Sequence, residues 1–139
     1  MATFNKFQPF VENLAEKVFN LQSDTLKVML VNTAPVNTNN QKSNLTEISA
    51  GNGYTAGGTA TTVSSSAQTS GTYKLVCADV VFTASGGSIG PFRYAVLYDS
   101  TATNSELIGY WDYGSSITLA DGETFTWDAD PTNGIIQLS

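Results

Sequence analysis

Histidine is absent from this chain of 139 residues, and Cys77 is its one cysteine. Catalysis near neutral pH depends mainly on histidine, thiolates, metals or closely paired carboxylates. Because most of these groups are missing, we expect no enzyme activity and no cofactor. A lone cysteine cannot form an intrachain disulfide, which fits synthesis in a reducing cytoplasm. Its apolar surroundings in residues 75–78 predict a small buried side chain rather than a reactive thiol.

Charge is also scarce. Charged residues make up 13% of the chain, against roughly 25% in an average soluble domain. Asp and Glu outnumber Lys and Arg by 12 to 6, for a net charge of −6, which disfavours contact with nucleic acid. No stretch approaches the ~18 apolar residues of a membrane span, and residues 1–7 lack the features of a secretory signal. We therefore expect neither a nucleic-acid partner nor a membrane partner.

The N-terminal segment carries the only helical pattern. Its apolar residues recur at three- and four-residue steps, namely Phe7, Phe10, Val11, Leu14, Val18 and Leu21. This spacing predicts one amphipathic helix over residues 9–19, with Pro9 in its first turn. Two roles are open for residues 1–24. The helix either packs on the core of its own domain or acts as an arm that docks on a neighbouring chain.

From residue 25 onward the pattern favours strands and turns. Residues 26–31 predict a strand with apolar groups on both faces, residues 34–43 a loop, and residues 59–66 an edge strand or exposed β-rich loop. Further strands are expected over residues 73–83, 92–98, 107–113, 117–119, 124–128 and 135–138. With no later helix to make parallel crossovers, residues 25–139 predict a single antiparallel β-sandwich or jelly-roll-like domain.

A glycine-rich segment, GNGYTAGG at residues 51–58, formally fits a dinucleotide-binding fingerprint. That motif works only where a strand leads into a helix whose N-terminus faces the pyrophosphate. Here Thr- and Ser-rich β sequence follows instead. We interpret the segment as a turn that carries Tyr54 over a neighbouring surface.

The loop at residues 128–134 is a weak candidate for a metal site. Asp128, Asp130 and Asn133 offer the carboxylate and amide oxygens that Ca²⁺ prefers. The loop lacks the spacing of a twelve-residue calcium loop that ends in a bidentate Glu. An Asp-Pro/Asn-Gly turn is therefore the favoured interpretation, and we predict no metal site.

Aromatic residues are dense in the second half of the chain. Strand alternation predicts that Trp111 and Tyr113 share one face of their strand, and it predicts a shared face for the aromatic and apolar set Phe92, Tyr94, Val96 and Tyr98. Rings of this kind fill a core, a subunit interface or a sugar-binding platform. We take Tyr54, Tyr110, Trp111 and Tyr113 as interface candidates, together with Phe7, Phe10, Val11 and Leu14 of the helical segment.

Several blocks of sequence, taken together, resemble small virion structural proteins of tailed bacteriophages. They are residues 23–28 with 32–35, 51–58, 86–98 and 107–114. Capsid cement (decoration) proteins are the nearest members. The resemblance implies a β-sandwich that forms a homo-oligomer, expected to be a trimer, and binds the major capsid protein on the outer surface of the virion. The alternatives are a tail or baseplate component of the same virion and, from another class, a carbohydrate-binding module.

Overall fold

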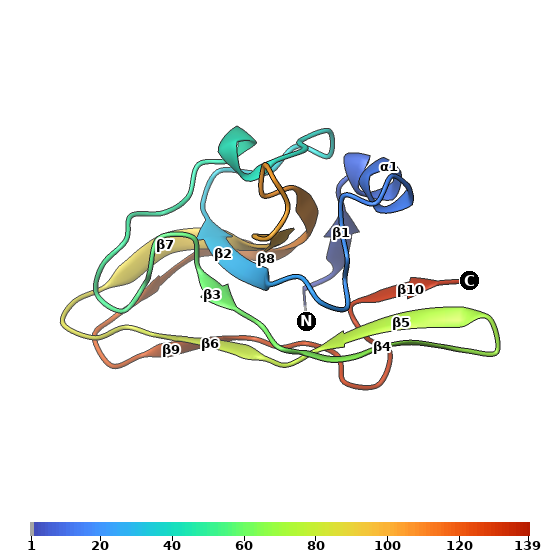
Figure 1. The fold of residues 1–139 in the computed structure, drawn as a ribbon. Coiled ribbons are helices and arrows are strands. Elements are labelled where there is room, and N and C mark those ends of the chain that lie inside the picture. Colours follow the sequence, from blue (N-terminus) through green and yellow to red (C-terminus); the bar gives the residue numbers. More distant parts are fainter. Residues whose placement is uncertain (1) are drawn as a thin grey trace.

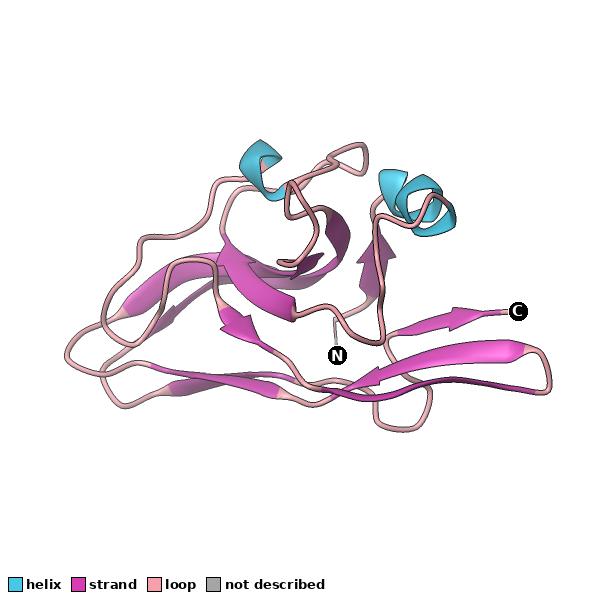
Figure 2. Cartoon of the chain, viewed as in Figure 1, coloured by secondary structure: helices cyan, strands magenta, loops and turns pink. Residues whose placement is uncertain are grey.

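The computed structural model describes residues 2–139 and is mainly β, with antiparallel pairing and one α-helix, as the sequence predicts (Figures 1 and 2). The helical elements are α1 (Pro9–Ala15) and a short 3-10 helix, η1 (Lys42–Asn44). The strands are β1 (Phe4–Lys6), β2 (Leu26–Val31), β3 (Thr59–Ala60), β4 (Val63–Thr69), β5 (Thr72–Cys77), β6 (Val80–Thr83), β7 (Ile89–Asp99), β8 (Leu107–Leu119), β9 (Thr124–Trp127) and β10 (Ile136–Leu138).

The strands form two layers. A five-stranded sheet has the order β1-β8-β7-β2-β3, and it lies over two smaller sheets, β10-β5-β4 and β6-β9 (Figure 1). The main core fills the space between the layers and includes Leu26, Phe92, Ile108 and Trp127. This sandwich-like arrangement buries the large side chains of strands that are far apart in the sequence.

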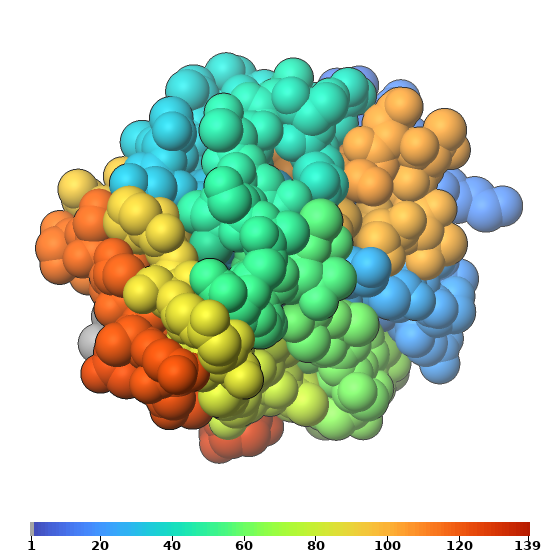
Figure 3. All heavy atoms as spheres, turned by 90° about the vertical axis from the view of Figure 1, so that its left-hand side faces the viewer, coloured from blue at the N-terminus to red at the C-terminus, as the bar shows by residue number. Residues whose placement is uncertain are grey.

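The outer face of the five-stranded sheet is buried as well. A second apolar cluster forms there from Phe7, Met29, Val31, Tyr94, Val96, Tyr98 and Leu107, with Leu45 packed against it. Leu45 belongs to the long connection at residues 32–58, which includes η1 and runs above β2 before it descends to β3 (Figure 1). In Figure 3 the teal atoms of this connection cover the middle of one side of the molecule. The apolar residues on both faces of β2 are thereby explained.

Helix α1 ends earlier than predicted, at Ala15 rather than Phe19. Lys17 adopts the left-handed conformation, with φ of 66°. The amides of Lys17 and Val18 then bond back to Leu14 and Asn13 in a Schellman closure. Glycine is the usual residue at this position, and because this chain has a lysine there, the end of the helix could not be predicted from the sequence. Beyond it, Phe19 and Leu21 reach the main core from an irregular segment.

Several predicted strands also differ in their boundaries. The predicted edge strand at residues 59–66 is divided between β3, in the five-stranded sheet, and β4, in the three-stranded sheet. The predicted strand at residues 73–83 is two strands, β5 and β6, which belong to different sheets. The break between them is held by the Ala78 amide, which donates to Thr62 O, and by the Asp79 carboxylate, which accepts the Ala129 amide at 2.8 Å. The predicted strands at 107–113 and 117–119 are instead one strand, β8, which continues through residues 114–116. Strand β1 and the helix η1 were not predicted.

An irregularity in the pairing of β7 with β8 changes one predicted face. Tyr94, Val96 and Tyr98 share the outer cluster as expected, but Phe92 lies in the main core. Phe92 pairs with Ile117 and Tyr94 pairs with Asp112, so a step of two residues along β7 spans a step of five residues along β8. At such an irregularity, side chains two residues apart can lie on opposite faces, and simple alternation fails across this point.

No helix in residues 2–139 has the length and apolar character needed to cross a membrane.

The helix offers a direct test of its packing. Phe10 is 1% exposed and its neighbour Val11 is 50% exposed. Replacing Phe10 by Ala should lower the free energy of unfolding by about 3–5 kcal/mol, because it leaves a cavity in the core. Val11→Ala, on the same helix, should change it by less than about 1 kcal/mol. Urea denaturation measures both, and equal losses for the two variants would contradict this assignment.

Candidate functional site

The N-terminal candidates divide between core and surface. Phe7 is fully buried in the outer cluster, with its ring 5.2 Å from that of Tyr110. Phe10 stacks on Phe19 at 5.5 Å inside the main core. The prediction that Phe7 and Phe10 contact a neighbouring chain is therefore wrong, because both rings are buried within their own chain. Leu14 packs partly against the main core, and Val11 is exposed.

Tyr54 is buried, which corrects the prediction that the glycine-rich turn carries it over a neighbouring surface. Its side chain is 2% exposed and belongs to the main core, 5.9 Å from the ring of Phe82. Its hydroxyl donates to Glu47 Oε2 at 2.5 Å and accepts the Leu30 amide at 3.1 Å. Burial, and next the hydrogen bond to Glu47, raise the pKa of Tyr54 well above its ordinary value. The hydroxyl is a structural donor and takes no part in a surface.

The glycines around Tyr54 permit close backbone approach. Gly58 has φ of +81°, and a Cβ there would overlap the carbonyl of Val28 on β2. Gly53 has φ of +100°, and a Cβ there would overlap the carbonyl of Thr83 on β6. These positions let the segment pass between the two layers. The geometry gives the motif a packing role, and no helix N-terminus follows it to hold a phosphate.

The remaining aromatic candidates on β8 point to opposite faces. Tyr110 packs partly against the outer cluster, and its hydroxyl donates to Asn37 Oδ1 at 3.2 Å. Trp111 is buried against Trp127, with ring centroids 5.1 Å apart in an edge-on arrangement. Tyr113 is partly buried and meets Phe125 edge-on at 4.9 Å. No aromatic residue among residues 2–139 is exposed, so these candidates do not form a sugar-binding platform together.

The loop at residues 128–134, the weak candidate for a metal site, forms a turn that is held by its own hydrogen bonds. Asp130 Oδ1 accepts the amides of Thr132 and Asn133, and the Asn133 side-chain amide donates to Asp130 Oδ2. The Asn133 bonds are the largest cause that lowers the pKa of Asp130. Asp128 is exposed. Asn133 thus presents N–H groups to Asp130 rather than an oxygen to a cation. Within the described residues no group of three or more His, Cys, Asp or Glu side chains is placed to hold a metal ion.

Cys77 is 4% exposed and lies in the main core. Burial raises the pKa of its thiol to about 11, against a smaller lowering by the hydrogen bond with Thr61. A thiol that stays protonated and enclosed is a poor nucleophile. The structure thus places Cys77 as a small core side chain, as the sequence indicates.

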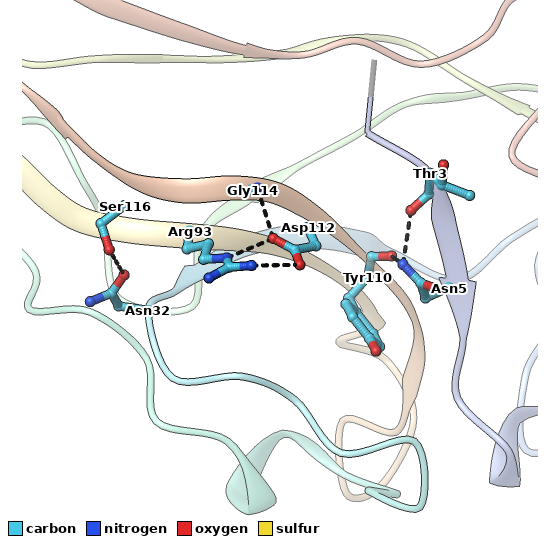
Figure 4. A network of polar contacts seen from close by, with 8 residues as sticks. All are labelled: Thr3, Asn5, Asn32, Arg93, Tyr110, Asp112, Gly114 and Ser116. Carbon is cyan, nitrogen blue, oxygen red and sulfur yellow. Dashed lines mark hydrogen bonds and ion pairs between the residues drawn. The ribbon is translucent and has the colours of Figure 1, made fainter.

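A polar strip runs along β7 and β8 (Figure 4). Arg93 makes a bidentate contact with Asp112, at 2.8 Å and 3.1 Å. This hydrogen bonding is the largest cause that raises the pKa of Arg93 and lowers the pKa of Asp112. Farther along the strip, Ser116 donates to Asn32 Oδ1 at 2.8 Å. Both charged side chains are more than a third exposed, so water screens the pair and its contribution to stability is small.

A groove of about 990 Å³ opens between three parts of the chain. One wall is the segment at residues 14–24, another is the sheet β10-β5-β4, and the third is the turn between β7 and β8. Its apolar lining comes from Leu14, Val18, Ala67, Tyr73 and Leu138, and its charged lining from Lys17, Asp24 and Glu106. The sequence did not reveal this groove, because its walls are distant in the chain and carry no common motif.

The groove and the adjoining strand β4 are the features that best fit a binding role. Strand β4 is an edge strand of its sheet, and most of its side chains are exposed. The groove receives Ser66, Ala67 and Gln68 from this strand. An extended segment of a partner chain is the kind of ligand that such an edge and hollow accept together.

Comparison with family models, with curated proteins and with solved structures finds no match for this chain.

The role of the glycines can be tested by single substitutions. Gly58→Ala should lower the free energy of unfolding by more than about 3 kcal/mol, because the added Cβ overlaps Val28 as well as straining the backbone. Gly51 also has a positive φ, but a Cβ there meets nothing within 4 Å. Gly51→Ala should therefore cost only the backbone strain, about 1–2 kcal/mol. Thermal and urea denaturation measure the difference, and equal costs would refute the close approach at Gly58.

Proposed function

We propose that this protein is a structural component of a tailed-bacteriophage virion, a capsid cement protein that contacts neighbouring major capsid subunits and stabilises the head. The resemblance of residues 51–58, 86–98 and 107–114 to such proteins supports the class. The protein would be made in the host cytoplasm and carried on the outer surface of the capsid.

The observation that carries the proposal is the edge strand β4. Its sequence is VSSSAQT, seven residues without a charge or a proline. Soluble monomers usually protect a long edge with lysine, proline or a covering segment, because an open edge pairs with other chains. Strand β4 has a register shift at Val63/Ser65 but remains regular from Ser65 to Thr69. An edge of this kind suits attachment to another subunit.

The composition of the surface supports the same role. With few charges, neighbouring copies repel one another little, which favours a closed homo-oligomer such as a trimer. Modest contacts used by several linked subunits give strong attachment through multivalency. A protein that binds only the assembled shell stabilises that shell by mass action. None of these steps needs a catalytic group.

A tail or baseplate component is the second candidate, because the same edge and groove would serve there. The carbohydrate-binding hypothesis has weaker support, since it depends on exposed rings and the candidate rings are buried or half-buried.

The location on the virion distinguishes the first two candidates. Tagged protein should decorate the whole capsid in electron micrographs of purified particles. Label confined to one vertex or to the tail would favour the second candidate, and the absence of label from particles would refute both.

Lysine substitutions test the edge itself. Ser65 and Ala67 are exposed on β4, and the double variant Ser65→Lys/Ala67→Lys should abolish oligomerisation and particle binding while the protein stays folded. Ser49→Lys, on the exposed loop at residues 32–58, is the control and should leave both unchanged. Light scattering and sedimentation with particles report the two properties. Unchanged assembly of the double variant would show that β4 is not the attachment edge.

A further inference from the structure

A fully buried carboxyl group lies at the end of β7, beside the groove. Asp99 is 0% exposed. Its Oδ1 accepts the amides of Thr101 and Ala102, at 2.9 Å and 3.2 Å. Its Oδ2 is buried, and no donor from residues 2–139 bonds to it. Burying an acceptor oxygen without a hydrogen-bond donor lowers the stability of the folded state, so a donor for this oxygen has to be found.

The group that faces Asp99 is a second carboxyl group, that of Asp24. Strands β2 and β7 are antiparallel, and Leu26 lies opposite Asp99. Asp24 precedes Leu26 by two residues and lies in the turn that leads into β2, next to the end of β7. The two side chains are within hydrogen-bonding reach of each other. Asp24 Oδ2 also accepts the Asn20 amide at 2.9 Å.

The backbone around this pair is already joined. The Thr25 amide donates to Thr101 Oγ1 at 2.9 Å, and the Ser100 amide donates to Thr25 O at 2.9 Å. These bonds hold the segment at residues 20–25 against the turn after β7, beside Asp24 and Asp99. Both segments contribute to the walls of the groove.

Within residues 2–139, no lysine or arginine forms an ion pair with Asp24 or Asp99. Glu106, the residue before β8, is itself acidic; its backbone carbonyl accepts the Asp99 amide, and its Oε1 accepts the Asn104 amide at 2.8 Å. Lys17 lines the same groove, but its side chain is exposed and forms no ion pair within residues 2–139. Two ionised carboxylates both accept hydrogen bonds and repel each other, so a direct bond between them requires a proton.

We propose that Asp24 and Asp99 share one proton, and that this proton makes them an acid-stabilised clasp between residues 20–25 and the turn after β7. When the proton is present, the clasp holds the two walls of the groove together. When it is lost, the paired negative charges weaken the junction. The clasp is independent of the proposed virion role, because it follows from the packing of this chain alone.

The direction of the pH dependence follows from the pKa of Asp99. Burial and then the contact with Asp24 raise this pKa, the two backbone bonds lower it, and the net result is about 7. In the unfolded chain Asp99 keeps its ordinary pKa of 3.8. The native state thus binds more protons between these values. The contribution of Asp99 to the free energy of unfolding is therefore fully present below the pKa of the unfolded state, and it is lost as the pH rises through about 7.

Urea denaturation between pH 5 and 8.5 tests the clasp. The midpoint of the wild-type protein should fall as the pH rises through this range. Asp99→Asn supplies a permanent N–H donor to Asp24 and keeps an oxygen for the amides of Thr101 and Ala102. That variant should have a higher midpoint than the wild type at pH 8.5 and a flatter profile. Asp24→Asn should behave in the same direction.

The matched control is Asp128→Asn, which removes one charge from an exposed aspartate outside the pair. It should retain the slope of the wild type. A wild-type midpoint that is constant over this range, or an Asp99→Asn variant that keeps the wild-type slope, would overturn the proposal.

Carbon-13 NMR of the aspartate carboxyl groups gives a readout that does not depend on stability. The signal of Asp99 should titrate near neutral pH in the folded protein, and the Asp24→Asn variant should lower the pH at which it titrates. Titration of Asp99 near pH 4 in the wild type would overturn the shared proton. So would stabilisation at pH 8 by calcium that disappears in Asp99→Asn, because a metal ion would then occupy the place of the proton.

Discussion

The hydroxyl group of Tyr54 is the contact on which the covering of the large sheet depends. Inside the protein it bonds to the backbone of β2 through the Leu30 amide and to the carboxylate of Glu47. The same Glu47 oxygen accepts the Gly57 amide at 2.7 Å, and the Tyr98 hydroxyl donates to the Gly57 carbonyl at 2.5 Å. Because burial and Glu47 raise the pKa of Tyr54, its hydroxyl remains a donor at any physiological pH. The long connection at residues 32–58 is thus fixed to the strand that it covers.

This anchoring has a consequence for function. The connection, the helix α1 and the smaller sheets together cover apolar side chains on both faces of the five-stranded sheet. The surfaces that stay open include the edge of β4, the groove beside it and the polar strip around Arg93 and Asp112 (Figure 4). An uncharged edge and a partly apolar groove suit a lasting contact with another protein subunit better than they suit chemistry on a small molecule.

The sequence predicted those features that follow from local periodicity. The two-faced pattern of β2, the change from a helix to strands after residue 24 and the buried setting of Cys77 are all in the structure. Features that depend on tertiary contacts were missed. The stop of α1 at a left-handed Lys17, the irregular pairing that places Phe92 in the main core and the division of residues 73–83 between two sheets have no local signal.

The candidate interface residues show the same limit. Apolar periodicity identified Phe7, Phe10 and Trp111 as side chains to be covered, but it does not say whether the cover comes from the same chain. Here it does. Tyr54 was expected at the surface because glycines and polar residues surround it, whereas those glycines allow its close passage into the core. The groove and the pair Asp24 and Asp99 arise only when residues 14–24 meet the turn after β7.

The most direct test of this account is the stability of Tyr54→Phe, measured by urea denaturation with amide hydrogen exchange at Leu30. Loss of the hydroxyl leaves the Leu30 amide and the Glu47 carboxylate without their shared partner, which should lower the free energy of unfolding by about 1–3 kcal/mol and speed exchange at Leu30. Tyr113→Phe, a change of the same atom in a half-buried ring, should be nearly neutral. If Tyr54→Phe unfolds like the wild type and Leu30 exchanges as slowly as before, Tyr54 is not the anchor of this fold.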